Sequence, residues 1–135
     1  MPRPVAAAIP PDLADLLTTN VPASLTLLRA DGLPVSHVMW LDYDGSLVLT
    51  SSPKSSYKSR ALRARPQVAI SVFDPADPWR RLSITGRVTG IRDDEGLAFI
   101  NRLSQRYTGR AYPRLGEREI FEITPETVRA FGGRG

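Results

Sequence analysis

The sequence predicts a mainly β, α+β fold in which an antiparallel β-barrel carries peripheral helices. Short alternating or apolar runs recur along the chain, Asp-Gly pairs stand at Asp31-Gly32 and Asp44-Gly45, and three segments have helical spacing. An Asp-Gly pair between two alternating runs is a strong hairpin signal, and consecutive hairpins build antiparallel sheets. At 135 residues the chain has the length of a single domain, residues 1–135.

Each of the three helical segments repeats apolar residues at three- or four-residue intervals. Prolines mark the start of the first and follow the second, because proline suits the first turn of a helix and not its interior. An aspartate precedes the third segment and is a common N-cap. We expect these helices at residues 11–19, 56–64 and 94–107, with Asp93 capping the last.

Alternating or β-branched runs between these segments predict about six strands. Two prolines within four residues, at Pro75 and Pro78, predict a loop over residues 74–78, because proline cannot donate a ladder hydrogen bond. Residues 1–10 contain only a short apolar run and read as an N-terminal arm without a secretory signal, so we expect a cytoplasmic protein. The strands are expected at residues 24–29, 35–43, 46–50, 67–73, 81–91 and 118–124.

The most informative segment is residues 47–62, where a predicted strand ends in hydroxyl side chains and basic residues lead into a helix. A helix N-terminus presents unpaired N–H groups and partial positive charge, and nearby lysines add full charge. This combination favours a phosphate-binding site. The alternative is a solvated turn whose serines cap the helix. The candidate residues are Thr50, Ser51, Ser52, Lys54, Ser55 and Lys58.

A second candidate is the loop that carries Trp79, Arg80 and Arg81 ahead of a predicted strand. An exposed indole beside a guanidinium can stack on a flat ring and pair with an anion. Simple packing of Trp79 in the core is the alternative.

His37 lies on a strand next to the strand that carries the hydroxyl residues, and an outward position without a role is its simplest interpretation. Ser36 beside it is no hydrolase signature, since no Gly-x-Ser-x-Gly elbow and no second histidine accompany it.

Four arginines at four-residue intervals follow the last predicted helix into a Gly/Pro-rich loop. They form either a solvated face or a basic rim that contacts the acidic tail of a ligand. They are Arg102, Arg106, Arg110 and Arg114.

Composition excludes several kinds of function. The chain has no cysteine and one histidine, which excludes thiolate nucleophiles, iron–sulfur clusters ligated by cysteine and multi-histidine metal sites, so no metal site is expected. No apolar run is long enough to span a membrane. The net charge of +4 favours anionic partners, but the arginines are spread over several elements and lack interleaved aromatics, so nucleic acid is not expected.

In this order, these segments resemble the pyridoxamine 5'-phosphate oxidase-like superfamily of FMN-binding split β-barrel proteins, and within it the small actinobacterial type that uses coenzyme F420. The resemblance covers nearly the whole chain beyond the arm. Its matching elements are the Arg29–Pro34 turn, the Val38–Tyr43 strand, the Leu47–Arg65 strand-turn-helix, the Asp74–Arg80 loop, the Leu82–Val88 strand and the Phe121–Glu126 segment.

The resemblance implies a homodimer with two cofactor sites at the subunit interface. The flavin or deazaflavin ring would lie against the backbone of residues 36–40 and 50–52, and Trp79 and Arg80 would approach from the partner subunit. The turn is one residue longer than the family pattern, and Ala61 stands where asparagine is frequent, so the assignment of Lys54 against Lys58 stays open. The implied cofactor site comprises Ser36, His37, Val38, Met39, Trp40, Thr50, Ser51, Ser52, Lys54, Ser55, Ser56, Lys58, Trp79 and Arg80.

The implied activity is that of an oxidoreductase which uses reduced F420 to reduce a small organic substrate. FMN is the alternative cofactor, and a non-catalytic carrier of flavin, deazaflavin or haem is the alternative function. No catalytic residue is expected, because in such proteins the cofactor carries the hydride chemistry while the protein binds and orients it.

Overall fold

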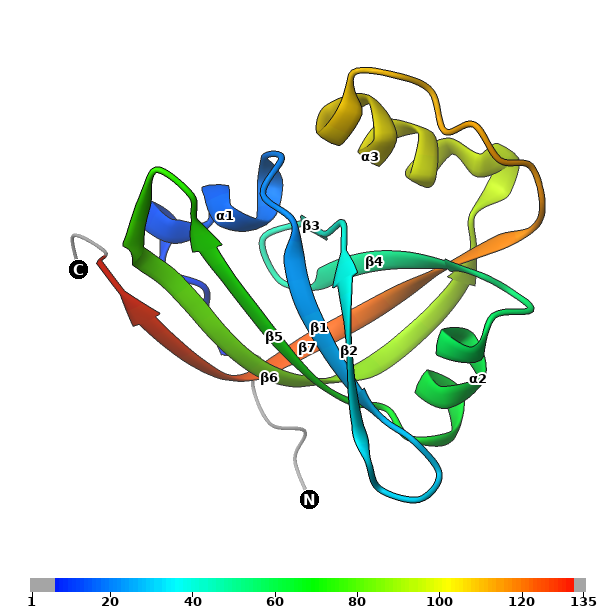
Figure 1. Ribbon diagram of the computed structural model, residues 1–135, viewed down its shortest axis with the longest axis horizontal. Coiled ribbons are helices and arrows are strands. Elements are labelled where there is room, and N and C mark those ends of the chain that lie inside the picture. The colour runs from blue at the N-terminus through cyan, green and yellow to red at the C-terminus, as the bar shows by residue number, and fades with distance from the viewer. Residues whose placement is uncertain (1–6, 133–135) are drawn as a thin grey trace.

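The computed structural model describes residues 7–132, and within them seven strands form one antiparallel sheet that curls into a half barrel (Figure 1). The strand order is β2-β1-β5-β6-β7-β4-β3. This confirms the predicted mainly β split-barrel class. The strands are β1 (Ala23–Leu28), β2 (Pro34–Met39), β3 (Asp42–Tyr43), β4 (Val48–Pro53), β5 (Gln67–Asp74), β6 (Asp77–Asp93) and β7 (Arg118–Phe131).

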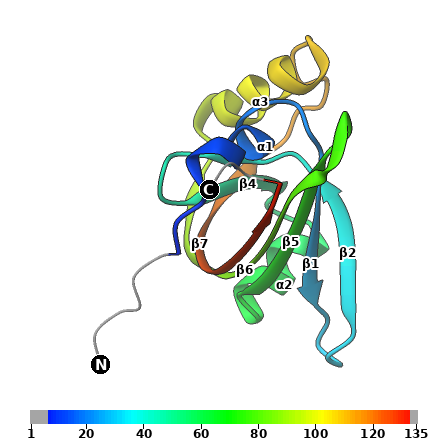
Figure 2. The same cartoon turned by 90° about the vertical axis from the view of Figure 1, so that its left-hand side faces the viewer.

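Three α-helices flank the sheet, and α1 and α3 lie at the same end of the molecule, at the top of Figures 1 and 2. Helix α2 follows β4, and α3 crosses above the end of the sheet at which β3 and β4 meet. The first predicted helix is present as a 3-10 turn followed by a short α-helix. The helical elements are η1 (Pro11–Leu13), α1 (Asp15–Thr18), α2 (Tyr57–Ala64), η2 (Glu95–Leu97) and α3 (Ala98–Thr108).

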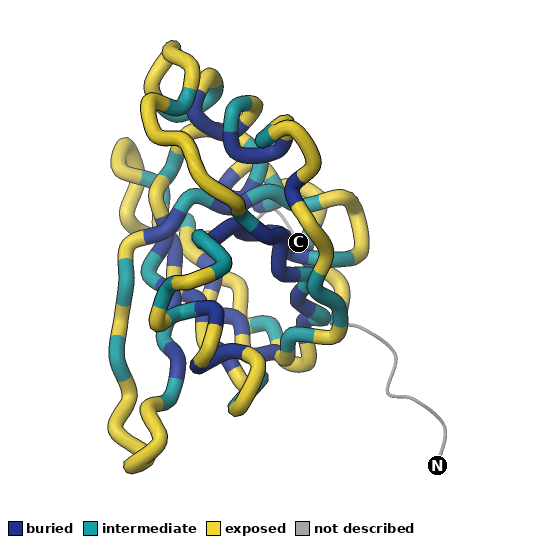
Figure 3. The backbone as a smooth tube through the Cα atoms, turned by 90° about the vertical axis from the view of Figure 1, so that its right-hand side faces the viewer, coloured by how far each residue is buried: buried dark blue, intermediate teal, exposed yellow. Residues whose placement is uncertain are grey.

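The core fills the inside of the curled sheet, as the buried stretches in Figure 3 show. Strands β1 and β5 alternate buried and more exposed residues, which is the pattern expected for a sheet with one solvent-facing side. Of the predicted N-terminal arm, residues 1–6 lie outside the described residues. Beyond them the Ala7 amide donates to the Pro125 carbonyl (2.9 Å), and Ile9 is buried in the core.

The strand expected over residues 35–43 differs from the sequence prediction because its two halves pair with different strands. The single strand expected over residues 35–43 is interrupted at Trp40-Leu41, since β2 pairs with β1 while β3 pairs with β4. At the interruption, the hydroxyl of Tyr107 accepts a hydrogen bond from the Leu41 amide (3.1 Å). The break therefore turns the end of β2 toward α3.

The expected loop over residues 74–78 is a tight hairpin instead, in which Asp74 already pairs with Asp77. Its prolines are tolerated because they lie at the end of the ladder. Helix α3 is capped by Asp94 and not by Asp93: the Asp94 carboxylate accepts from the Phe99 and Ile100 amides at 2.8 and 2.9 Å.

Strand β7 runs on to Phe131, past Pro125, which a bulge in the ladder with β6 accommodates at Gly86. Glycine is required there, since a Cβ atom would lie 2.4 Å from the Thr124 carbonyl oxygen.

A buried ion pair joins α2 to β7. The Arg63 guanidinium donates two hydrogen bonds, of 2.5 and 2.6 Å, to the carboxylate of Glu119, whose side chain is 2% exposed. The hydrogen bonds from Arg63 lower the pKa of Glu119 against the opposing effect of its burial. This pair fixes the helix that follows the hydroxyl-rich strand β4 against β7, the neighbour of β4 in the sheet.

We expect Arg63→Met to lower the free energy of unfolding by about 3 kcal/mol at neutral pH, because it leaves the Glu119 carboxylate buried without its charged partner. Chemical denaturation measures the loss. The control is Arg60→Met on the same helix, whose exposed guanidinium bonds only to the Ser55 carbonyl, with an expected change within about 0.5 kcal/mol.

The pH dependence separates the ion pair from simple packing. The depressed pKa of Glu119 adds stability that is fully present above the carboxyl's unfolded pKa and is lost as the pH falls through the lower folded value. Without Arg63 the pKa of Glu119 rises, so protonation of this carboxyl removes less stability from Arg63→Met, and the difference in unfolding free energy between the two proteins shrinks as the pH falls. Identical pH profiles for the two proteins would contradict this role.

Candidate functional site

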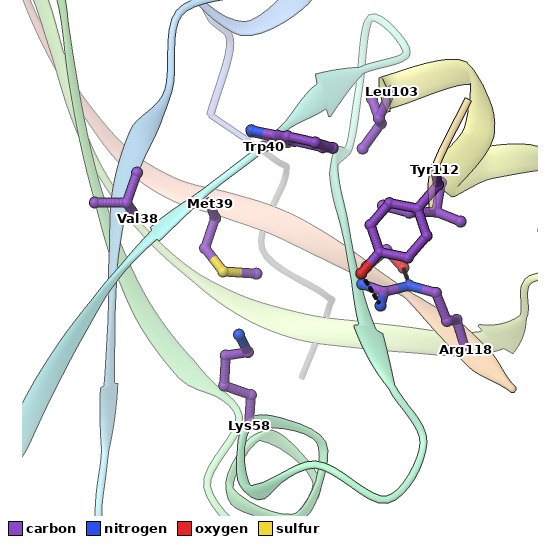
Figure 4. Close-up of a pocket in the computed structure, with 9 residues that line it drawn as sticks. Val38, Met39, Trp40, Lys58, Leu103, Tyr112 and Arg118 are labelled. Carbon is purple, nitrogen blue, oxygen red and sulfur yellow. Dashed lines mark hydrogen bonds between the residues drawn. The ribbon is translucent and has the colours of Figure 1, made fainter. Parts of the chain in front are cut away.

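A cavity of about 200 Å³ opens between the end of β2, the first turn of α2, the face of α3 and the start of β7 (Figure 4). Five helices and strands contribute to it, because Ser51 of β4 also lines it, and Tyr112 comes from the loop after α3. The lining residues are Val38, Met39, Trp40, Ser51, Lys58, Ile100, Leu103, Tyr112 and Arg118.

One wall of the cavity is flat and aromatic. The Trp40 indole stacks on the Tyr107 ring, with centroids 5.2 Å apart and planes 11° from parallel. Helix α3 is held in place by Arg106, which donates to the Asp42 carboxylate (3.0 Å) and to the Leu41 carbonyl, and by Arg102, which also pairs with Asp42 (2.8 Å). The predicted basic rim is thus partly a structural contact between α3 and β3.

Lys58 reaches into the cavity from the first turn of α2 (Figure 4). The helix starts here because the Ser56 hydroxyl caps it, accepting from the Ser59 amide (3.2 Å). No carboxylate in residues 7–132 forms an ion pair with Lys58. Burial, and then the charge of Arg118, lower the pKa of Lys58.

Arg118 enters the same cavity from the start of β7, also without a carboxylate at ion-pair distance among the described residues. Its Nε donates to the Ser51 hydroxyl and its Nη1 donates to the Tyr112 hydroxyl, both at 3.0 Å. Burial is the main cause that lowers the pKa of Arg118. Two cations on different elements therefore face one cavity with no acidic partner.

Such an arrangement favours the binding of an anion. Buried or half-buried cations are normally paired, and an unpaired set in a cavity is typical of a binding site. The positive end of α2 adds to the same field.

His37 lies behind this cavity and does not line it. Its side chain is on the more buried face of β2, between the exposed Ser36 and Val38, so the outward position considered for it from the sequence is not observed. Its Nε2 atom is buried without a hydrogen-bond partner. Burial, and secondarily the charge of Lys58, lower the pKa of His37, which keeps the imidazole neutral at pH 7.

The structure brings together some of the residues predicted for the cofactor site. Five of them line the cavity: Val38, Met39, Trp40, Ser51 and Lys58.

Other predicted hydroxyls are used inside the protein. The Thr50 hydroxyl donates to the Trp40 carbonyl (3.0 Å), and the hydroxyls of Ser52 and Ser56 share a hydrogen bond of 2.7 Å. Thr50 and Ser52 are buried, whereas Ser55 and Ser36 are exposed and lie outside the cavity lining.

Lys54 points away from Lys58. Its Nζ lies 2.8 Å from the Asp93 carboxylate and 3.9 Å from that of Glu117, and the hydrogen bond to Asp93 raises its pKa. Of the two lysines, Lys58 is the one that lines the cavity, and which of them holds a cofactor phosphate stays a prediction.

The Trp79–Arg80 pair lies elsewhere on the same chain. Arg80 donates to the carboxylates of Asp74 (2.6 Å) and Asp15 (2.8 Å), and so fastens the β5–β6 hairpin to α1. Trp79 is 73% exposed, with Arg81 stacked over its ring. An approach of this pair to a site on a partner subunit stays a prediction.

Sequence reasoning missed the far wall of the cavity, which comes from Ile100, Leu103, Tyr112 and Arg118. Of these, Arg118 carried a signal, because it is a basic residue at the first position of a predicted strand. Nothing in the local pattern indicated that the Arg118 side chain would lie beside Ser51. That follows from the pairing of β7 with β4, in which Ser51 lies opposite Ile120.

Within residues 7–132 the structure contains no group of three metal-ligating side chains and no helix with the length and apolar character that crossing a bilayer requires.

Comparison with known proteins gives a consistent picture of the family. The family model described as pyridoxamine 5'-phosphate oxidase matches residues 9–132. A solved F420 reductase is similar at 31% identity and a TM-score of 0.82, covering 90% of this chain and 98% of its own. No match was found among curated proteins.

Two more distant structures share the fold. A conserved hypothetical protein from Mycobacterium tuberculosis is 22% identical with a TM-score of 0.75, covering 98% of this chain and 89% of its own. General Stress Protein 26 from Bacillus anthracis is 18% identical with a TM-score of 0.68, covering 91% and 93%.

The charge of Lys58 should be visible at the single histidine. We expect Lys58→Met to raise the pKa of His37, because the substitution removes a neighbouring positive charge, yet to leave it below the ordinary value, because burial is the larger cause. An NMR titration of the imidazole C–H signals in untagged protein measures both. Lys54→Met is the control and should leave the His37 pKa unchanged; equal shifts in both variants would contradict the geometry.

Proposed function

The chain belongs to the pyridoxamine 5'-phosphate oxidase family of oxidoreductases, and we propose that it uses reduced coenzyme F420 to reduce a small unsaturated organic substrate. The observation that carries the proposal is Lys58, a cation without an acidic partner among the described residues, at the helix start beside a flat aromatic wall. The F420 reductase at 31% identity supports this choice of cofactor.

The residues present fit a cofactor of this kind. A phosphate group would find the Lys58 ammonium and the N-terminal amides of α2, which favour anions for the same electrostatic reason. A planar ring would find the end of β2 and the Trp40 side chain. When bound, the reduced deazaflavin would supply a hydride and become oxidised, and a proton would complete the reduction of the substrate.

The residues of the chain itself would bind the cofactor and orient its ring. The Trp40–Tyr107 stack and the Asp42 contacts hold the wall rigid, so the ring position does not depend on a mobile side chain. Neutral His37 adds no second charge beneath the site. The exposed Arg110 and Arg114 remain available for the acidic tail of F420, whereas Arg106 is already paired with Asp42.

FMN is the alternative cofactor, because it too joins a phosphate to a tricyclic ring and the matching family model is that of an oxidase. A non-catalytic carrier of flavin, deazaflavin or haem is the alternative function. A cytoplasmic location and the absence of nucleic-acid partners remain predictions from the sequence.

We also propose that the working form is a homodimer that completes the cofactor site. The cavity of about 200 Å³ is smaller than the roughly 300–1,000 Å³ of sites that enclose a drug-sized ligand, so one chain supplies only part of the surface needed. Beside it, Val38 on the edge strand β2 is 78% exposed. An apolar side chain on an open strand edge is a suitable place for a second chain.

We expect the purified protein to bind F420 more tightly than FMN, and Lys58→Ala to weaken F420 binding by about 1.5–3 kcal/mol, the range for a hydrogen bond to a charged group. Titrations followed by cofactor fluorescence measure both affinities. Lys54→Ala and Arg60→Ala are matched controls that remove one positive charge each, from the adjoining turn and from the same helix. They should change the affinity by less than about 0.5 kcal/mol.

Three results would contradict the assignment. Unchanged affinity in Lys58→Ala would remove Lys58 from the site. A loss in Lys54→Ala of the same size would move the phosphate to the Asp93 side of the turn. Binding of neither cofactor by the wild-type protein would contradict the proposed function itself.

The dimer has its own test. Light scattering at micromolar concentration with cofactor present should give twice the mass of the 14.9 kDa chain. Val38→Glu, which places a charge on the exposed edge of β2, should shift the mass toward the monomer, because burying an unpaired carboxylate in an interface is unfavourable. A monomeric wild-type protein would overturn the proposal.

A further inference from the structure

The cavity contains a second cation that the cofactor phosphate does not require. Lys58 comes from α2 and Arg118 from β7, and in Figure 4 their side chains enter the cavity from different directions. Both lack an acidic partner among residues 7–132. If Lys58 takes the phosphate, Arg118 is left with a positive charge that no carboxylate of residues 7–132 meets at ion-pair distance.

Two hydrogen bonds within the protein hold the Arg118 guanidinium in one orientation. Ser51 accepts from its Nε and the Tyr112 hydroxyl accepts from its Nη1. Tyr112 is itself tied to α3, since its amide donates to the Asn101 side-chain oxygen (2.9 Å). The guanidinium is therefore positioned before any ligand arrives, which lowers the entropic cost of binding.

The orientation leaves donors free. Nη2 of Arg118 has no hydrogen-bond partner among the described residues. A guanidinium with an open edge matches a planar carboxylate, with which it can form two parallel hydrogen bonds.

The rest of the cavity limits the size and shape of the ligand. Around Arg118 the walls are the flat Trp40 and Tyr112 rings and the aliphatic side chains of Ile100 and Leu103. A volume of about 200 Å³ suits a molecule of the size of a single ring. Apart from the two cations and the hydroxyls of Ser51 and Tyr112, the lining is aromatic or aliphatic, so a ligand with an anionic group on an apolar body is favoured.

We propose that Arg118 is the substrate-anion residue of this site, and that the substrate is a small, flat organic acid whose carboxylate it binds. The inference rests on the proposed function, since it assigns the phosphate to Lys58. The shared chemistry is an oxyanion, which could come from the substrate or from the cofactor phosphate, and the experiment distinguishes the two.

The test is an NMR titration of the cofactor-free protein with benzoate, with benzamide and with inorganic phosphate as probes. The signals followed are the Arg118 Nε–H and the Trp40 indole N–H, which lie on opposite sides of the cavity. Benzoate should shift both signals and neutral benzamide neither. Equal shifts with benzoate and benzamide would overturn the proposal, because they would mean apolar packing without charge recognition.

The variants separate the two cations. Arg118→Gln should weaken benzoate binding about tenfold or more at the Trp40 signal, and Lys58→Gln by about threefold or less. Arg118→Lys keeps the positive charge but loses the planar guanidinium, and its loss of benzoate affinity should lie between those of the two glutamine variants. If Arg118→Gln does not fold, Tyr112→Phe replaces it, and loss of the orienting hydroxyl should weaken benzoate binding several-fold. Equal losses at Lys58 and Arg118 would overturn the separate assignment.

A final arm identifies the source of the anion. In protein saturated with F420 or FMN, benzoate should still shift the Arg118 signal. Competition between benzoate and the cofactor at Arg118 would mean that the cofactor phosphate occupies this residue, and would overturn the substrate assignment. If neither cofactor binds, the proposed function fails, while the cofactor-free titrations still report on Arg118.

Discussion

The ion pair between Arg63 and Glu119 sets the geometry on which the site depends. It joins α2, which carries Lys58, to β7, which begins at Arg118. A carboxylate that is 2% exposed can remain ionised there only with its bidentate partner. The pair therefore helps to hold Lys58 and Arg118 at one cavity even though their like charges repel.

The site shows how local instability and function go together in this fold. Burial lowers the pKa of both Lys58 and Arg118, and the charge of Arg118 lowers the pKa of Lys58 further. A chain selected for stability alone would place a carboxylate between them. Its absence among the described residues is the feature that points to a ligand, more than the cavity volume or the hydroxyl content of β4, whose Thr50 and Ser52 serve internal hydrogen bonds.

The sequence predicted most of the fold and about half of the cavity. Local signals sufficed for the hairpin turns, the cap of α2 and an antiparallel barrel with helices, because each depends on residues close together in the chain. They also indicated Lys58 and Ser51, whereas the split-barrel class and Trp40 came from the family resemblance. They could not indicate Tyr112, since its place depends on a long loop, nor separate Lys54 from Lys58, since only the pairing of Lys54 with Asp93 removes it from the cavity.

The roof of the cavity consists of α3 and the chain that follows it, which supply Ile100, Leu103 and Tyr112. It is attached to the half barrel through the contacts of Arg102 and Arg106 with Asp42 and Leu41 and through a small apolar cluster of Leu49, Phe99, Leu103 and Ile120. The floor belongs to the sheet and α2. Mutation could therefore reshape the roof, and with it the choice of acceptor, while the cofactor platform stays intact. A scaffold divided in this way can diversify in evolution without rebuilding its redox chemistry each time.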